Sequence, residues 1–307
     1  MRTHLFPRAA ARCGIGKLGH VYYPTSQSNQ PTAERQCSLV RSALVSQLHA
    51  HAVYVDVCAD QSDLPMQKLG GKIAIVTGAS QGIGRAVAQR LYAEGANLVL
   101  ASLPEHGNAE DVIKQIGASG DRALVVEGDL RQVKFVKRLF EETEQRFGAP
   151  HIVAAIAGVN MNRPVVDTTD DDYDRIFSIN TRATFWIFRE AAHKIRDGGR
   201  ILGVSSNMVL QGRPGVALYA ASKAAVEQFV RILAKEIGKR NVTVNAIAPG
   251  PTDTAMVSQL SRDTAPAITP LGRLGQPSDI ADVVAFLVSE DAHWVTGQII
   301  GVNGGIV

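Results

Sequence analysis

Tyr219 and Lys223 lie four residues apart in the stretch LYAASKAAVEQF, residues 218 to 229. Residues at this spacing on a helix lie on one face, one turn apart. A free tyrosine loses its proton near about pH 10, which is too high for rapid proton exchange at neutral pH. A nearby ammonium group stabilises the phenolate and lowers the tyrosine pKa, so the pair could transfer a proton. The same spacing is common on ordinary helices, so the hypothesis needs support from other residues.

A glycine-rich stretch, TGASQGIG at residues 77 to 84, follows a short apolar run and opens a helical pattern. Gly78, Gly82 and Gly84 stand at G-x-x-x-G-x-G spacing. Glycine lets the backbone turn tightly and approach a pyrophosphate, whose charge is then met by free amides at the helix start. A helix cap with incidental glycines is the alternative. The position between a strand and a helix favours dinucleotide binding.

Seven short apolar runs predict buried strands, at residues 72–77, 97–101, 123–128, 151–157, 200–205, 242–248 and 298–302. Between them, apolar residues recur at spacings of three and four, as amphipathic helices require. Alternating strands and helices imply right-handed crossovers and a parallel sheet that is covered on both faces. We predict one doubly wound α/β domain with a seven-stranded parallel sheet and a site at the carboxyl ends of its strands.

Residues 68 to 307 resemble the short-chain dehydrogenase/reductase family, because TGASQGIG looks like the cofactor turn of that family. The resemblance implies a Rossmann-type domain that carries both cofactor and substrate, usually in a homotetramer or homodimer, with no metal in its chemistry. It also implies that the cofactor contacts the remaining residues of the turn, Ser80, Gln81 and Ile83.

The end of the second strand bears on which nicotinamide cofactor is bound. An acidic residue there accepts hydrogen bonds from the ribose and repels a 2′-phosphate. Ala101 and Ser102 stand where NAD-preferring members of the family usually have an aspartate. Because Ser102 can donate to a phosphate, NADP(H) is favoured over NAD(H). Glu105 could instead reach the ribose, and Arg85 could help to bind the phosphate, but no arginine stands in the turn or directly after the strand to decide between the cofactors.

Two later segments resemble further cofactor contacts of the family. Asp129 and Leu130, in EGDLRQ, resemble the pair that meets the adenine; the alternative for Asp129 is a cap on the helix that begins near Val133. The stretch APGPTDT, residues 248 to 254, resembles the segment that meets the nicotinamide carboxamide, and its alternative is an ordinary turn. Its candidate contacts are Pro249, Gly250, Thr252 and Thr254.

The candidate catalytic residues are also carried by the resemblance. Ser206 lies thirteen residues before Tyr219, the spacing of the family's substrate-orienting serine, with Ser205 as the competitor. Asn180 lies in a helical pattern that disfavours asparagine, and it is either an exposed or kinking residue or the asparagine that holds a water on the proton path. The implied catalytic set is Asn180, Ser206, Tyr219 and Lys223, and the last two would also contact the cofactor.

The sequence departs from the family's asparagine-rich motif after the fourth strand. That motif is AIAG here, residues 155 to 158, which keeps Ala157 and Gly158 but lacks both asparagines. We therefore expect other groups to supply some hydrogen bonds that stabilise the sheet.

Composition limits the classes of partner. The 307 residues include 32 basic and 29 acidic side chains, and the net charge of +3 points to neither nucleic acid nor an anionic membrane. No stretch approaches the roughly 18 uncharged apolar residues of a membrane helix. All three cysteines precede residue 60, so the body has no cysteine metal site or disulfide framework.

Residues 1–65 differ from the rest, because they show no sustained period and include the polar run PTSQSNQPT. Early arginines and a first acidic residue at Glu34 are typical of a mitochondrial targeting segment, although Pro7 weakens that interpretation. We interpret 1–65 as a dispensable or disordered N-terminal extension and 66–307 as the catalytic domain, starting at Met66. The expected location is cytoplasmic, or mitochondrial if the extension is a leader.

These patterns predict a NADP-preferring oxidoreductase that transfers a hydride between nicotinamide and a small carbonyl or alcohol substrate. The body resembles 3-oxoacyl-acyl-carrier-protein reductases and NADPH-dependent aldehyde and ketone reductases, and the sequence does not separate the two. The segment 255 to 275 is a candidate lid. A non-catalytic dinucleotide-binding regulator or scaffold is the alternative, which the intact Ser206, Tyr219 and Lys223 disfavour. Candidate pocket walls are the apolar Met161, Met208, Val209, Met256 and Leu260.

Overall fold

The computed structural model describes residues 67–103, 105, 109–117 and 121–307. The predicted N-terminal extension, residues 1–65, lies outside the described residues.

Seven parallel strands form one sheet in the described part of the chain, in the order β3-β2-β1-β4-β5-β6-β7. The strands are β1 Ile73–Thr77, β2 Asn97–Ser102, β3 Ala123–Glu127, β4 Ile152–Ala155, β5 Arg200–Val204, β6 Thr243–Pro249 and β7 Ile299–Val302. The predicted fold class and all seven strands are confirmed, with only the strand ends displaced. Because β1 pairs with both β2 and β4, the chain reverses its direction of winding there, and ligands of such sheets bind at that reversal.

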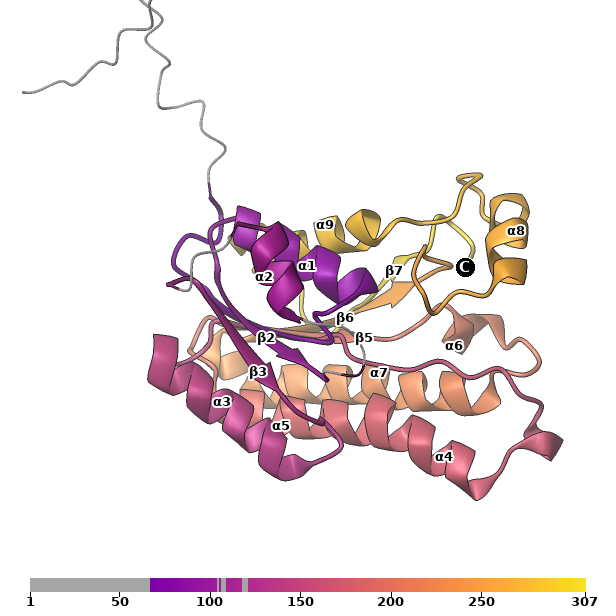
Figure 1. Cartoon of the computed structure of the whole chain (residues 1–307), viewed down its shortest axis with the longest axis horizontal. Coiled ribbons are helices and arrows are strands. Elements are labelled where there is room, and N and C mark those ends of the chain that lie inside the picture. The colour runs from indigo at the N-terminus through magenta and orange to yellow at the C-terminus, as the bar shows by residue number, and fades with distance from the viewer. Residues whose placement is uncertain (1–66, 104, 106–108, 118–120) are drawn as a thin grey trace, which may run out of the picture. The chain divides into compact units, whose positions relative to one another are not determined.

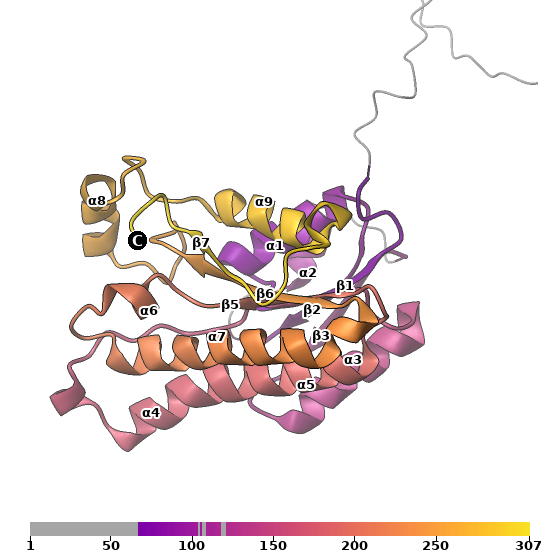
Figure 2. The ribbon, with the colours of Figure 1, turned by 180° about the vertical axis from the view of Figure 1, so that it is seen from behind.

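Helices cover both faces of the sheet (Figure 1). On one face lie α1 Gly82–Ala93, α2 Ala109–Gln115 and α9 Pro277–Val288, and on the other lie α3 Val133–Phe147, α5 Thr184–Lys194 and α7 Ala217–Ile237. The view from behind shows the same two layers (Figure 2). Each face therefore has its own apolar core beneath its helices.

The β2 strand shows how one sequence supplies both cores. Leu98 and Leu100 pack into the core under α1 and α9, whereas Val99 and Ala101 pack into the core above α3 and α5. Successive side chains of a strand point to opposite faces, so a continuous apolar run is needed where both faces are covered.

The outer strands correct one expectation. All seven runs were expected to form buried strands, but β7 is half-buried and β3 is only partly buried. These two strands are the edges of the sheet, so each has a neighbouring strand on one side only.

Shorter elements surround the carboxyl end of the sheet, where α6 Met208–Gln211 follows β5 and α8 Gln259–Ile268 follows β6 (Figure 1). The candidate lid contains α8. After β4 come the 3-10 turn η3 Val165–Asp167, then α4 Asp170–Phe177 and the π-helical turn η4 Ser178–Ala183, which leads into α5. The remaining turns are η5 Gly238–Arg240 and η6 Glu290–Ala292. Among the described helices, none is both long and apolar enough to cross a membrane.

Candidate active site

The glycine turn between β1 and α1 is built so that side chains would not fit. Gly78 and Gly82 have φ of +66° and +52°, the left-handed region that favours glycine. A Cβ on Gly84 would stand 2.1 Å from the carbonyl oxygen of Gly78, and a Cβ on Gly78 would stand 2.9 Å from the Cα of Ala157. Gly78 and Gly84 therefore allow a close approach of backbone to backbone.

The first turn of α1 presents its backbone amides at this point. The N-cap residue, Gln81, makes no side-chain capping hydrogen bond, and Gly82 and Ile83 follow it as the first helical residues. Uncapped amides at a helix start favour an anion. The Arg85 guanidinium donates to the carbonyl oxygen of the buried Ser80, at 3.0 and 2.7 Å. Arg85 thus braces the turn.

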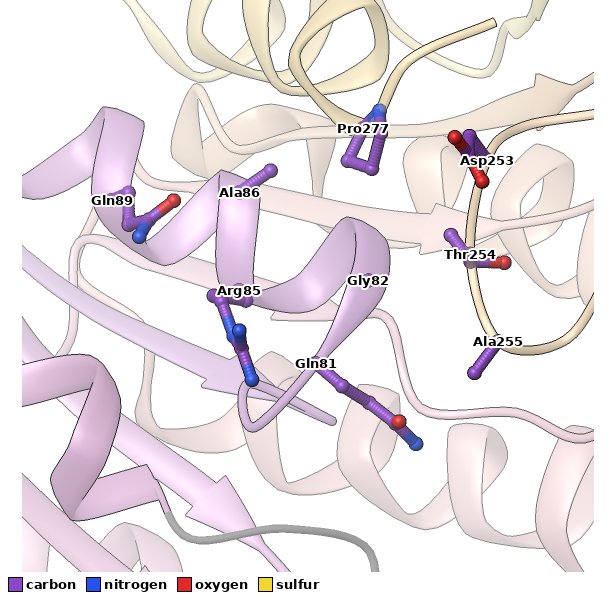
Figure 3. A pocket seen from close by; sticks show the side chains of 9 residues that line it. All are labelled: Gln81, Gly82, Arg85, Ala86, Gln89, Asp253, Thr254, Ala255 and Pro277. Carbon is purple, nitrogen blue, oxygen red and sulfur yellow. The ribbon is translucent and has the colours of Figure 1, made fainter. Parts of the chain in front are cut away.

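The glycine turn lies beside the segment after β6. Both were predicted to contact the cofactor, so they have to be close to each other. A Cβ on Gly82 would lie 3.1 Å from Cγ2 of Thr254. A cavity of about 340 Å³ opens between Gln81, at the start of α1, and Asp253 and Thr254 (Figure 3). It is lined by Gln81, Gly82, Arg85, Ala86, Gln89, Asp253, Thr254, Ala255 and Pro277.

The segment itself is held by its own backbone and hydroxyl groups. Pro249 ends β6, and a Cβ on Gly250 would lie 2.8 Å from the Cα of Asn303. Thr252 donates from its hydroxyl to the carbonyl oxygen of Gly250 at 3.0 Å and forms a backbone bridge with Gly275. The segment at residues 249–254 is thus anchored along its length beside the glycine turn.

The end of β2 contains a buried hydroxyl group that could donate a hydrogen bond to a ligand. Ser102 is 4% exposed, and its Oγ has no hydrogen-bond partner among the described residues. A buried polar atom normally has a partner, so the hydroxyl is available to a bound group. Glu105, the rival contact, is exposed.

Asp129 is not the helix cap that the sequence left open. The α3 helix begins at Val133, and its N-cap is Gln132. The Asp129 carboxylate instead accepts from the Arg131 backbone at 2.8 Å and from the Arg131 guanidinium at 2.9 and 3.0 Å. Burial raises the pKa of Asp129, but these hydrogen bonds outweigh it and hold the pKa below its ordinary value. Leu130 lies between Asp129 and Arg131 in the chain and packs against the core that α3 and α5 cover.

The proposed acid and its tuning lysine lie on α7, facing the end of β5. The Ser206 side chain acts on the Tyr219 hydroxyl group, because it lowers the pKa of Tyr219. One turn along, the Lys223 ammonium donates to the carbonyl oxygen of Val204 at 3.0 Å, and Lys223 is 4% exposed. The predicted constellation of Ser206, Tyr219 and Lys223 is therefore brought together.

The electrostatics differ from the expectation for Tyr219. Burial raises the pKa of Tyr219, and the Ser206 hydrogen bond lowers it only in part, so the expected fall is wrong for this arrangement. Burial also lowers the pKa of Lys223 to about 8. Both shifts have one cause, since an apolar environment disfavours the charged form of either group. Tyr219 therefore remains a neutral phenol at neutral pH and can act as an acid.

The two candidate serines have different partners. The Ser206 Oγ accepts from the Met208 backbone at 3.2 Å and lies at Tyr219, whereas the Ser205 Oγ donates to Glu227 at 2.7 Å. The residue spacing thus selected the serine that faces the tyrosine.

Asn180 is fully buried in the π-helical turn, so its interpretation as an exposed helix residue is wrong. Its amide side chain exchanges two hydrogen bonds with the backbone of Val159 and donates a third to Ser222 at 3.0 Å. Ser222 in turn donates to the carbonyl oxygen of Tyr219 at 2.7 Å. Sequence reasoning missed Ser222, although its place between the tyrosine and the lysine was a usable signal. Short π-helical turns often occur at functional sites.

The AIAG segment is compensated by Thr77, the first residue of the glycine motif. Its hydroxyl oxygen accepts from the backbone amides of Ile156 and Ala157 at 3.0 and 3.2 Å. A Cβ on Gly158 would lie 3.0 Å from the Lys223 Nζ and 3.1 Å from the Asn180 Oδ1. The retained glycine therefore leaves room for both catalytic candidates.

The chain contains no obvious metal ligand set in its described part, where no group of three or more His, Cys, Asp or Glu side chains could hold an ion. The glycine cradle, the uncapped start of α1 and the free Ser102 hydroxyl fit a phosphate-bearing dinucleotide instead.

Comparison with known proteins agrees with this geometry. The family model described as enoyl-(acyl carrier protein) reductase matches residues 78–307. A hydroxynaphthalene reductase-like protein, Arp2 of Metarhizium brunneum, is 42% identical over 259 residues, which cover 78% of this chain and 97% of the relative. Versicolorin reductase 1 of Aspergillus parasiticus is 40% identical over 254 residues, with coverage of 78% and 97%.

A solved structure shares both the fold and the sequence pattern. The angucycline C-6 ketoreductase LanV with bound NADP matches with a TM-score of 0.72 and 36% identity, and the match covers 78% of this chain and 96% of LanV. The glycine turn, the Tyr-x-x-x-Lys pair and these similarities lead to one conclusion: the chain belongs to the short-chain dehydrogenase/reductase family and is an NAD(P)-dependent oxidoreductase.

Proposed function

We propose that this protein is an NADPH-dependent ketone reductase in which Tyr219 donates the proton. The observation that supports this most directly is the meeting of α7 with the end of β5, where Lys223 donates to the carbonyl oxygen of Val204 at 3.0 Å and the Ser206 side chain lowers the pKa of Tyr219. All three residues lie at the carboxyl end of the sheet, where ligands of doubly wound folds bind.

The arrangement suits reduction at neutral pH. When bound, NADPH supplies the hydride for the carbonyl carbon. Ser206 donates a hydrogen bond to the carbonyl oxygen, and Tyr219 gives that oxygen its proton as negative charge develops there. Burial raises the pKa of Tyr219 and keeps the phenol protonated, whereas the Ser206 side chain lowers that pKa and so favours release of the proton. Lys223 orients the cofactor ribose, and Asn180 holds the loop after β4 against α7 through Val159 and Ser222.

The cofactor would be held by groups at or after the ends of β1, β2, β3, β5 and β6. The glycine turn and the start of α1 receive the pyrophosphate, Ser102 donates to the 2′-phosphate, and the segment after β6 meets the nicotinamide. The NADP bound to LanV supports the choice of NADPH. The proposed contacts are Gly78, Ser80, Gln81, Gly82, Ile83, Gly84, Ser102, Asp129, Leu130, Pro249, Gly250, Thr252, Thr254, Tyr219 and Lys223.

We propose fused aromatic ketones as the substrate class. The names of Arp2 and versicolorin reductase 1 support it, and so does the apolar character of the loops at the carboxyl end. Exposed apolar side chains project from the connections after β4, β5 and β6, and they offer a surface for a flat apolar molecule. They are Val166, Leu210, Met256, Leu260 and Leu271.

A substrate panel tests the proposal. NADPH or NADH consumption would be measured with a bicyclic aromatic ketone, a 3-oxoacyl thioester and simple aldehydes. We expect the aromatic ketone with NADPH to give the highest kcat/KM, whereas a preference for the thioester would favour the 3-oxoacyl-acyl-carrier-protein reductase activity. The absence of turnover across the panel, despite NADPH binding, would favour the non-catalytic regulator or scaffold.

One pair of variants tests the role of Tyr219 in the same assay. Tyr219→Phe removes the acid and should lower kcat by about 10²- to 10⁴-fold while the NADPH Kd stays within about twofold. Tyr173→Phe is the matched control, because Tyr173 is half exposed and stacks on Phe177. Equal activity of Tyr219→Phe and Tyr173→Phe would rule out the proposed acid.

We also propose that the chain forms a homodimer or homotetramer. Phe185 on α5 and Ile232 on α7 are exposed at 42% and 50%, and these two helices are neighbours. Apolar side chains left exposed on adjacent helices are typical of a surface that another subunit covers. Light scattering on the purified protein distinguishes the two assemblies from a monomer.

A further inference from the structure

The carboxyl end of β5 is held by three successive turns of α7. Lys223 donates to the carbonyl oxygen of Val204 at 3.0 Å. Glu227 accepts from the hydroxyl group of Ser205 at 2.7 Å, and the next residue, Ser206, lowers the pKa of Tyr219. The three helix residues are spaced by four, so they form one stripe along α7. Two of them belong to the proposed chemistry, and Glu227 does not.

Glu227 is an unusual residue to find at this place. Its side chain is 9% exposed, and a buried carboxylate is costly unless it is hydrogen bonded or paired. Both of its oxygens are engaged: Oε1 accepts from Ser205, and Oε2 accepts from the Arg231 guanidinium at 3.0 Å. Since Arg231 is 41% exposed, its pairing with the carboxylate is screened by water, and the bond to Ser205 is the buried one.

Ser205 transmits the position of Glu227 to the site. Its backbone amide donates to Ile247 of β6 at 2.7 Å, and its side chain is fixed to α7, so the residue is held in two directions. Ser206 is the next residue of the chain, and its hydroxyl group faces Tyr219. A change at Ser205 therefore changes the distance between the two hydroxyl groups that the proposed reaction uses.

We infer that Glu227 is a positioning residue, which acts through Ser205 to hold Ser206 at the Tyr219 hydroxyl. The inference rests on the proposed carbonyl reductase function and adds to it a residue that need not touch the substrate or the cofactor. Small displacements of catalytic groups can cost about 10²-fold in rate, so such a contact has a measurable effect.

The experiment compares Glu227→Gln, Glu227→Ala and Ser205→Ala in the full chain. Glutamine keeps an acceptor oxygen for Ser205 but loses the charge, whereas either alanine removes the hydrogen bond. We expect Glu227→Ala and Ser205→Ala to lower kcat by about 10- to 100-fold with an unchanged NADPH Kd. Glu227→Gln should retain kcat within about threefold, and the double alanine variant should be no worse than either single one.

Arg231→Gln is the control for a merely electrostatic effect, because it removes the exposed ion pair and leaves the Ser205 bond in place. Its kcat should equal that of the wild type. If Glu227→Gln were as slow as Glu227→Ala, the charge rather than the Ser205 bond would be responsible and the inference would fail. Should Glu227→Ala not fold, the comparison of Ser205→Ala with Glu227→Gln decides the same question.

A second measurement does not depend on turnover. Tyr219 ionisation is followed by the ultraviolet absorbance of phenolate, as the difference between each variant and its Tyr219→Phe counterpart. Since the Ser206 hydrogen bond lowers the pKa of Tyr219, its loss in Ser205→Ala and Glu227→Ala should move the titration to higher pH. An unmoved titration in both variants would overturn the inference. A wild type that reduces no carbonyl compound, but whose variants shift the titration, would reject the proposed function alone.

Discussion

The side chain of Asn180 pairs with the backbone of Val159 in both directions. Val159 donates from its amide to the Asn180 Oδ1 at 2.8 Å, and the Asn180 Nδ2 donates to the Val159 carbonyl oxygen at 2.9 Å. A side-chain amide is the group that matches a peptide unit in this way, because it offers one acceptor and two donors. The loop after β4 is thereby fastened to the π-helical turn.

Asn180→Asp should therefore destabilise the fold. The carboxylate has no N–H to offer the Val159 carbonyl oxygen or the Ser222 hydroxyl, and it is buried. We expect a loss of about 3 kcal/mol in the free energy of unfolding, measured by denaturant titration at neutral pH. Ser178→Ala, in the same turn, loses only an exposed bond to Arg175 and should change the value by less than about 0.5 kcal/mol. Equal stabilities of the two variants would show that the Asn180 bonds to Val159 and Ser222 do not stabilise the fold.

Lys223→Met should make the protein inactive but more stable. Burial lowers the folded pKa of Lys223 to about 8, below the unfolded value of 10.5, so keeping its charge in the fold costs about 3 kcal/mol at neutral pH. Loss of the bond to Val204 offsets about 1 kcal/mol of this, which leaves a net gain of about 2 kcal/mol.

The pH dependence of that gain gives the control. Between the folded and unfolded pKa values the unfolded state binds more protons, so wild-type stability rises with pH from about 8 to 10.5. Lys223→Met lacks this rise, and its advantage should disappear by the upper end of the window. A gain that does not change with pH would point to packing instead of charge. Lys235→Met, on an exposed part of the same helix, is the control variant, measured over the same pH range.

Gly84→Ala should damage both the fold and cofactor binding. The added Cβ would meet the Gly78 carbonyl oxygen at 2.1 Å, and that backbone cannot move aside as a flexible side chain could. We expect a destabilisation of about 3 kcal/mol and at least a tenfold rise in the NADPH Kd, from thermal unfolding and fluorescence titration. Gly238→Ala is the matched control. A Cβ on Gly238 would meet no atom of the neighbouring elements within 4 Å, and its φ of −58° is an ordinary helical value. Normal NADPH binding by Gly84→Ala would refute the proposed role of the turn.

Ser102→Ala should separate the two cofactors. If the Ser102 hydroxyl donates to the 2′-phosphate, its removal should weaken NADPH binding by about tenfold and leave NADH binding unchanged. Without cofactor, the variant should be as stable as the wild type or more stable, because the lost hydroxyl is buried and has no partner among the described residues. Isothermal titration with both cofactors checks the first outcome. An equal loss for NADPH and NADH would instead place Ser102 away from the phosphate.

A protein that starts at Met66 should retain the activity of the full chain. The family match begins at residue 78 and β1 begins at Ile73, so the catalytic parts lie downstream of Met66. We expect kcat/KM and the midpoint of thermal unfolding to agree with those of the full chain within experimental error. A fall in either quantity would show that residues 1–65 contribute to the working protein.

Much of the fold could be predicted because it depends on local patterns. Apolar runs gave all seven strands, since a strand covered on both faces must be continuously apolar, and the glycine motif lies at the turn that its spacing requires. The distance in sequence between Ser206 and Tyr219 pointed to the serine that affects the pKa of Tyr219, whereas Ser205 donates to Glu227. Each of these properties is a matter of order and spacing along the chain.

The features that could not be predicted depend on contacts through space. The pKa of Tyr219 is governed by its burial in the folded protein. The role of Thr77 as a substitute for the missing asparagines appears only when β1 and β4 are placed side by side. Glu227 resembles any polar residue of an amphipathic helix until its carboxylate is seen to meet Ser205.

The α7 helix has a consequence for how this protein can change. Tyr219, Lys223 and Glu227 take their mutual spacing from 21 residues of regular helix, about 30 Å long, while the exposed apolar side chains of residues 255–275 lie on a different connection. We therefore expect mutation or grafting in that connection to alter which substrate is accepted, while the proposed acid and its supports keep their spacing. Substrate choice and the proposed proton transfer would then be able to change independently of each other.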